Sequence, residues 1–101
     1  MIIFNVTTII EEDIQQEFLL FMHTVYFPAV LKTQKFKEAK LYRMTEPVNE
    51  GITYCAQYFA QTAEDLESYR NEYLPDLQQI LMQQFPNKVV FFSSILAPEI
   101  K

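Results

Sequence analysis

The side chains best suited to catalysis in this chain are few and lie far apart. The 101 residues include a single histidine, His23, and a single cysteine, Cys55. A thiol next to an imidazole can form a nucleophile and its base. At about 100° per residue, however, His23 lies on the side of its predicted helix opposite Ile14 and Phe18, so it points away from the strand that carries Cys55. We therefore predict no catalytic residues, and we expect Cys55 to be buried as a small hydrophobic residue.

The same composition disfavours metal and nucleotide sites. A lone histidine and a lone cysteine do not supply the His/Cys cluster that zinc requires. The only glycine is Gly51, whereas the loops that bind phosphates and dinucleotides each need several glycines. We expect neither a metal nor an organic cofactor.

Polar side chains on three predicted strands form a more informative set. Alternation along the strands places Asn5, Thr7, Tyr42 and Gln57, together with Cys55, on one face of a sheet. Amide and hydroxyl groups in a mostly apolar cavity are typical of small-ligand sites. Asn5, Thr7, Tyr42 and Gln57 are therefore the candidate ligand-binding residues. In the alternative interpretation, Asn5 and Gln57 hydrogen-bond to each other across neighbouring strands.

The strands that would carry these residues are indicated by β-branched and alternating segments. Residues 2–10 predict a first strand, and residues 37–45 and 52–60 predict a hairpin around a turn that contains Gly51. Residues 88–96 predict a fourth strand. Each of these segments has apolar side chains on at least one of its two alternating sets.

Two helices are predicted between the strands. The first begins near residue 12 after an acidic segment and is kinked by Pro28. The second begins at the capping pair Thr62 and Asp65 and is interrupted by Pro75. The inward-facing residues are predicted to be Ile14, Phe18, Phe21, Met22 and Val25 in the first helix, and Leu66, Tyr69, Tyr73, Leu77 and Ile80 in the second.

This order of elements predicts one ferredoxin-like α+β domain over residues 1–101, with the pattern βαββαβ. The length lies within the roughly 50 to 200 residues of a single domain. Right-handed crossovers give an antiparallel sheet of strand order 4-1-3-2 with both helices on one face.

Charge and hydropathy narrow the classes of partner. The chain has 8 basic and 13 acidic residues and a net charge of −5. Binding to nucleic acid requires a cationic face that displaces counterions from phosphates, so no nucleic-acid partner is expected. The apolar runs are far shorter than the ~20 residues of a membrane span, so no membrane association is expected. A lone cysteine forms no internal disulfide, and we predict a cytoplasmic location.

The sheet face without helices is predicted to be too apolar for a monomer. When helices cover one face of an antiparallel sheet, the other face is normally polar. In the fourth strand both alternating sets are apolar, so either Phe91 or Phe92 remains on the helix-free face. A phenylalanine left in water loses ~1.5–3 kcal/mol of burial free energy and adds to an exposed apolar patch that favours association.

The two outer strands of the predicted sheet agree with this inference. Lys37, Lys40 and Arg43 protect one edge, whereas the other strand has no charge between Val89 and Pro98. An unprotected apolar edge predicts a homodimer packed sheet to sheet, called a dimeric α+β barrel. The alternative is a monomer whose tail or helix covers the face. The candidate interface residues are Ile3, Ile9, Val90, Phe91 and Phe92.

Motifs over nearly the whole chain share the pattern of one known family: Ile3-Phe4-Asn5-Val6-Thr7, Pro28, Gly51-Ile52-Thr53-Tyr54 to Gln57-Tyr58, Glu64-Asp65-Leu66-Glu67-Ser68-Tyr69, and Phe91-Phe92 to Leu96. Together they resemble the uncharacterised bacterial family called domain of unknown function 4286. The resemblance implies a ferredoxin-like, dimeric α+β-barrel fold in a bacterial cytoplasm and implies no known activity. Family members often place histidine two residues before the helix-breaking prolines, where this chain has Tyr26 and Tyr73.

The leading functional hypothesis is a homodimer that holds a small apolar molecule or a partner segment between its two sheets. One alternative is a cofactor-independent oxygenase or related α+β-barrel enzyme, which rests on analogy of fold alone. A second alternative is a structural dimer without a ligand.

Overall fold

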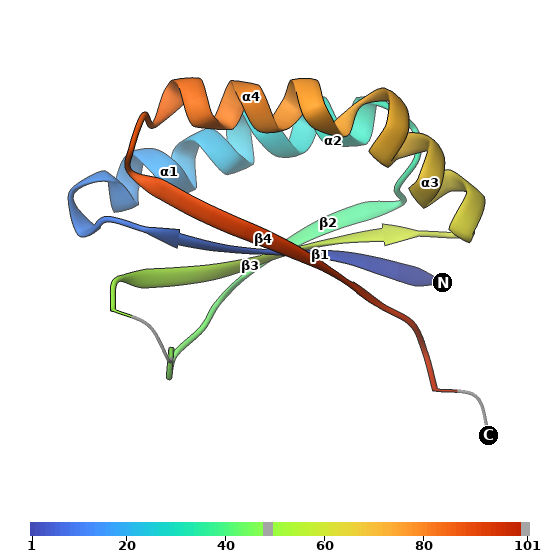
Figure 1. The fold of residues 1–101 in the computed structure, drawn as a ribbon, viewed down its shortest axis with the longest axis horizontal. Helices are drawn as coiled ribbons and strands as arrows, with labels where there is room; N and C mark the ends of the chain where they lie inside the picture. The colour runs from blue at the N-terminus through green and yellow to red at the C-terminus, as the bar shows by residue number, and fades with distance from the viewer. Residues whose placement is uncertain (48–49, 100–101) are drawn as a thin grey trace.

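A computed structural model describes residues 1–47 and 50–99 as a four-stranded antiparallel sheet beneath a layer of helices (Figure 1). The order of strands is β2-β3-β1-β4, which is the predicted 4-1-3-2 read from the opposite edge. Val48 and Asn49 of the predicted turn lie outside the described residues. The strands are β1 (Ile2–Ile10), β2 (Glu38–Arg43), β3 (Ile52–Ala60) and β4 (Val89–Leu96).

The helices form two runs that both cover the same face of the sheet (Figure 1). This arrangement confirms the predicted α+β, ferredoxin-like fold class. Within the described residues, no helix is long and apolar enough to span a membrane. The first run comprises η1 (Glu12–Ile14), α1 (Gln15–Phe21), η2 (Met22–Tyr26) and α2 (Phe27–Lys32), and the second comprises α3 (Ala63–Glu72) and α4 (Leu74–Gln84).

Pro28 changes the phase of the first helical run. Proline has no backbone N–H, and its ring crowds the carbonyl four residues before it. Just ahead of Pro28 the chain widens into the π-helix η2, in which the Phe27 N–H donates to the Met22 carbonyl. The wider turn rotates the side chains that follow, so Tyr26 and Phe27 are buried and Val25 is exposed. The prediction that Val25 faces the core was wrong.

Pro75 has a similar effect on the second helical run. The Thr62 hydroxyl accepts from the Asp65 N–H at 3.1 Å, which confirms the predicted start of this run. Pro75 lies in the first turn of α4, after a break at Tyr73 that ends α3. The break resets the helical phase, so Leu81 is buried where Ile80 was predicted, and Ile80 is exposed.

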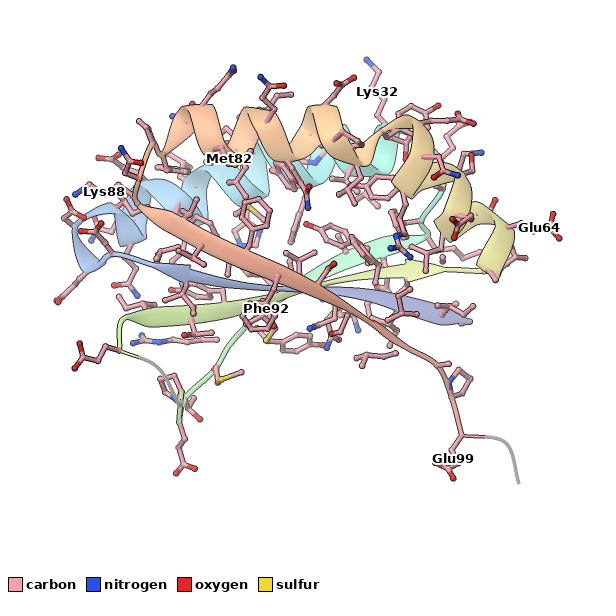
Figure 2. The ribbon with its side chains drawn as sticks, in the orientation of Figure 1. Lys32, Glu64, Met82, Lys88, Phe92 and Glu99 are labelled. Atoms are coloured by element: carbon pink, nitrogen blue, oxygen red, sulfur yellow. The ribbon has the colours of Figure 1, made fainter. Side chains whose placement is uncertain are left out.

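The hydrophobic core fills the space between the helices and the sheet (Figure 2). From β1, Phe4 and Ile10 point into this space and are almost completely buried. Tyr58 of β3 packs beside Phe4, with ring centroids 6.3 Å apart. The opposite face of the sheet has no helix over it, and we call it the helix-free face.

Candidate functional site

The helix-free face collects all four candidate ligand-binding residues. The strand register pairs Asn5 with Gln57 and Thr7 with Cys55, and Tyr42 also pairs with Cys55. Side chains of paired residues project from the same face of an antiparallel sheet. Because these residues alternate with the buried side chains of β1 and β3, they lie on the side away from the helices.

A chain of hydrogen bonds connects the polar residues of this face. The Gln57 Nε2 donates to Asn5 Oδ1 at 3.3 Å. The Asn5 Nδ2 donates to Thr7 Oγ1 at 3.3 Å and to Ser94 Oγ at 3.4 Å. The predicted hydrogen bond between Asn5 and Gln57 is therefore confirmed. Both amide hydrogens of Asn5 are used, which holds this side chain in one orientation.

Ser94 is a member of this network that sequence reasoning missed. It pairs with Asn5 across the β1–β4 register. The pattern of the fourth strand is apolar on both sides, so the outward-facing set could not be chosen from it. Once Phe92 is known to face outward, Ser94 follows two residues later on the same face.

The polar centre of the helix-free face is recessed between apolar side chains. Asn5 is 9% exposed and Thr7 is 8% exposed, although no helix covers them. On the β4 side, Val90 is 65% exposed and Phe92 is 55% exposed. Tyr42 is exposed on the β2 side. The face therefore has a centre of small polar groups of low exposure, with exposed side chains on either side of it.

The register of β4 separates the five candidate interface residues into two groups. Val90 pairs with Ile9, Phe92 pairs with Thr7, and Leu96 pairs with Ile3, all on the helix-free face. Figure 2 shows Phe92 on the side of β4 away from the helices. Phe91 instead pairs with Thr8 and packs against the core. Four of the candidates, Ile3, Ile9, Val90 and Phe92, share one surface, and Phe91 is removed from the set.

His23 and Cys55 lie on different layers of the molecule. His23 is exposed on η2, with its ring 5.8 Å from that of Phe27. Cys55 is half-buried rather than buried, because it faces the helix-free side, where its Sγ lies 3.8 Å from Thr7 Oγ1. The structure does not bring the imidazole and the thiol together. Residues 1–47 and 50–99 contain no group of three His, Cys, Asp or Glu side chains able to hold a metal.

Residues 1–98 match the model of the family described as "Domain of unknown function (DUF4286)". The chain belongs to the DUF4286 family. The match confirms the resemblance that the sequence motifs indicated. Among curated proteins, none matches this DUF4286 chain.

Solved structures of other proteins share the fold of this DUF4286 chain at low sequence identity. A NIPSNAP domain protein from Burkholderia xenovorans has a TM-score of 0.66 and 18% identity, covering 98% of this chain and 95% of its own. An ethd family protein from Bacillus halodurans has a TM-score of 0.65 and 14% identity, with coverages of 98% and 100%. A protein described as a dimeric ferredoxin-like protein, from an uncultured marine organism, has a TM-score of 0.62 and 12% identity, with coverages of 99% and 95%.

Proposed function

We propose that this DUF4286 protein is a homodimer whose two sheets pack together through their helix-free faces, and that it binds a small, mostly apolar molecule between them. The observation that carries the proposal is the recessed polar centre of the helix-free face between exposed apolar side chains. It supports both a partner that covers the exposed side chains and a ligand beside the polar centre.

A second copy of the chain is the partner that we propose covers the exposed side chains of the helix-free face. Burying an exposed side chain such as Phe92 contributes ~1.5–3 kcal/mol, so covering these side chains stabilises the complex. A similar solved protein is described as dimeric, which supports a partner of the same kind. In a two-fold dimer the same patch occurs on both subunits, so Val90 and Phe92 of each copy contribute twice.

The ligand would occupy the space above the small residues of the face. Two sheets packed face to face lie about 10 Å apart. Large side chains from both sheets fill this space, whereas short ones leave part of it open. Asn5, Thr7 and Ser94 are too short to fill it. Gln57 keeps an amide N–H and a carbonyl that the hydrogen bonds of the described residues do not use. We therefore propose that Asn5, Thr7, Tyr42 and Gln57 line the site and that Gln57 bonds to a polar group of the ligand.

The dimer is tested by sedimentation equilibrium at micromolar concentration, where a two-chain mass is expected. The ligand site is tested with 1-anilinonaphthalene-8-sulfonate, an amphipathic dye with an apolar aromatic body and one anionic sulfonate, which should bind once per dimer. Gln57→Leu should weaken the dye about tenfold because it removes a hydrogen bond, whereas Gln16→Leu on the exposed side of α1 should not. A monomeric mass, or equal dye affinity in both variants, would contradict the proposal.

The two alternative functions predict different results in these experiments and in one further measurement. A structural dimer without a ligand would have a two-chain mass but no stoichiometric dye site. An oxygenase would consume dioxygen when supplied with its substrate, which an oxygen electrode detects. Only the binding protein combines a stoichiometric site with no turnover.

A further inference from the structure

An apolar pocket of about 240 Å³ lies on the helix-free face, at the end of the sheet where β1 begins and β4 ends. The strand register places Phe59, Ile3 and Leu96 side by side across β3, β1 and β4 on this face. Figure 1 shows the chain after β4 continuing away from the helices, and this segment supplies a further wall. The pocket is lined by Met1, Ile3, Phe59, Leu96, Ala97 and Pro98.

The size and the walls of this end pocket suit a small apolar group. None of the side chains that line it among the described residues has a charge, a hydroxyl or an amide. A cavity of about 150 Å³ is large enough to bind benzene, so the end pocket has room for one aromatic ring or a short branched alkyl group. Leu96, Ala97 and Pro98 are exposed, so a ligand can reach the pocket from solvent.

A positive charge lies beside the end pocket. Lys40 of β2 pairs with Gln57 of β3, which places it on the helix-free face. Its Nζ lies 5.5 Å from the centroid of the Phe59 ring, which is part of the pocket wall. Glu38 lies on the same face of β2, but Lys40 forms no ion pair with it or with any other carboxylate of the described residues. An ammonium group without a carboxylate partner thus lies next to an apolar pocket.

We propose that the end pocket binds a small monocarboxylic acid. An aryl or branched alkyl group of the acid fills the pocket, and its carboxylate accepts a hydrogen bond from Lys40 Nζ. A cationic ligand is disfavoured because its charge would lie close to that of Lys40. This site goes beyond the proposed function, since each subunit forms one from its own residues, at the end of the helix-free face rather than at its polar centre.

The probes 3-phenylpropanoate and 3-phenylpropanamide test the proposal, because they have nearly the same shape but only the first is an anion at pH 7. Each is titrated into the full chain by isothermal titration calorimetry. The carboxylate should bind one molecule per chain and about fivefold more tightly than the amide. This preference should shrink between about 0.05 and 0.5 M salt, which screens exposed charges. Equal affinities at low salt, or absence of carboxylate binding, would overturn the proposal.

Two lysine variants test whether the preference for the anion comes from Lys40. Lys40→Met removes the charge and keeps an apolar stem, so it should abolish the preference and leave amide affinity unchanged. The matched control is Lys32→Met, because Figure 2 shows Lys32 on the helical layer, pointing away from the sheet. It changes the net charge equally and should keep the preference. The same loss in both variants would assign the preference to net charge and make the proposal wrong.

A third variant tests whether the pocket holds the apolar group. Ile3→Phe narrows the pocket and should weaken both probes several-fold, with native circular dichroism. Unchanged affinity of both probes in this folded variant would place the binding site elsewhere and contradict the proposal.

Competition with 1-anilinonaphthalene-8-sulfonate separates this inference from the proposed function. The dye has three aromatic rings and is too large for a pocket of this volume, because a single benzene already needs about 150 Å³. Saturating 3-phenylpropanoate should therefore leave the dye bound. Displacement of the dye would place both ligands in one site and overturn the separate pocket.

The oligomeric state separates the two proposals further. Phe92→Asp, the expected monomer, keeps every residue of the end pocket and should bind 3-phenylpropanoate as the wild type does. Binding by this variant alone would mean that the partner subunit fills the pocket, which would overturn the inference. A monomeric wild type that binds the carboxylate through Lys40 would contradict the proposed function and support the end pocket.

Discussion

Asn5 and Tyr58 are both buried, but their polar groups are in different states. Asn5 lies next to Thr7, Gln57 and Ser94, whose side chains satisfy its amide. The ring of Tyr58 lies among those of Phe4, Phe27 and Phe36, and burial raises the pKa of its hydroxyl. Burial therefore holds Asn5 in a polar network on one face of the sheet and Tyr58 among aromatic rings on the other.

Three buried tyrosines predict a loss of stability at alkaline pH. The pKa of Tyr26, Tyr58 and Tyr69 is raised by burial in the folded state, whereas in the unfolded chain it is about 10. Below pH 10 both states keep the proton and the stability is fully present. As the pH rises above 10 the unfolded state loses protons that the folded state keeps, so the free energy of unfolding falls.

Absorbance at 295 nm, which reports tyrosinate, checks this prediction when it is followed together with circular dichroism. Half of the six tyrosines should ionise only when the helical signal is lost. A variant with Tyr58→Phe should ionise one tyrosine fewer in that step. Ionisation of all the tyrosines near pH 10 with native circular dichroism would contradict the assignment.

Prolines and side-chain alternation determine what the helices and strands present to their neighbours. Pro28 and Pro75 divide each helical run and shift its phase, which is why Val25 and Ile80 are exposed. In β4 the alternation is undisturbed, so Phe91 and Phe92 project to opposite faces. Two adjacent residues of the same type therefore have different roles: Phe91 packs against the core, and Phe92 lies on the outer surface.

Aspartate substitutions at these two adjacent positions should give different results. Phe91→Asp places a charge beside the core and should lower the free energy of unfolding by about 2–4 kcal/mol. Phe92→Asp should keep native circular dichroism and give a monomer by sedimentation, because it places an unpaired charge in the proposed interface.

Ser93→Asp is the matched control, since Ser93 is exposed on β4 and does not face the helix-free side. It should remain dimeric and folded. If Phe92→Asp remains dimeric as well, the interface does not involve the helix-free face.

At the scale of the whole molecule, this four-stranded sheet has apolar side chains on both of its faces but only one internal core. The helices and the sheet enclose the core between them, and no segment of the described chain covers the other face of the sheet (Figure 1). A partner subunit is the simplest cover for a face with this pattern. Folding and association would then be coupled, because the dimer loses its interface when either subunit unfolds.

Coupled folding and association predict that the thermal midpoint depends on protein concentration. A tenfold increase in concentration stabilises a dimer by about 1.4 kcal/mol, which should raise the midpoint by about 3–5 °C for a particle of this size. Differential scanning calorimetry at two concentrations measures this shift. Phe92→Asp should have a midpoint independent of concentration, and a wild-type midpoint that does not change would contradict a dimer.

The amino-acid sequence by itself determined the order of the elements, the fold class and the shared face of Asn5 and Gln57. These follow from local rules, because alternation and turn chemistry act over a few residues of the chain. The apolar excess on the helix-free face also follows from composition, since Phe91 and Phe92 cannot both face one core.

Only the tertiary structure decided which phenylalanine faces the helices, how far each proline shifts its helix, and that three tyrosines meet around a cavity. When both alternating sets of a strand are apolar, the choice of face depends on the register with β1 rather than on the strand itself. The helical phase after Pro28 depends on how the widened turn packs against the sheet. Tyr26, Tyr58 and Tyr69 come from three different elements, and only tertiary packing brings them to the wall of the same cavity.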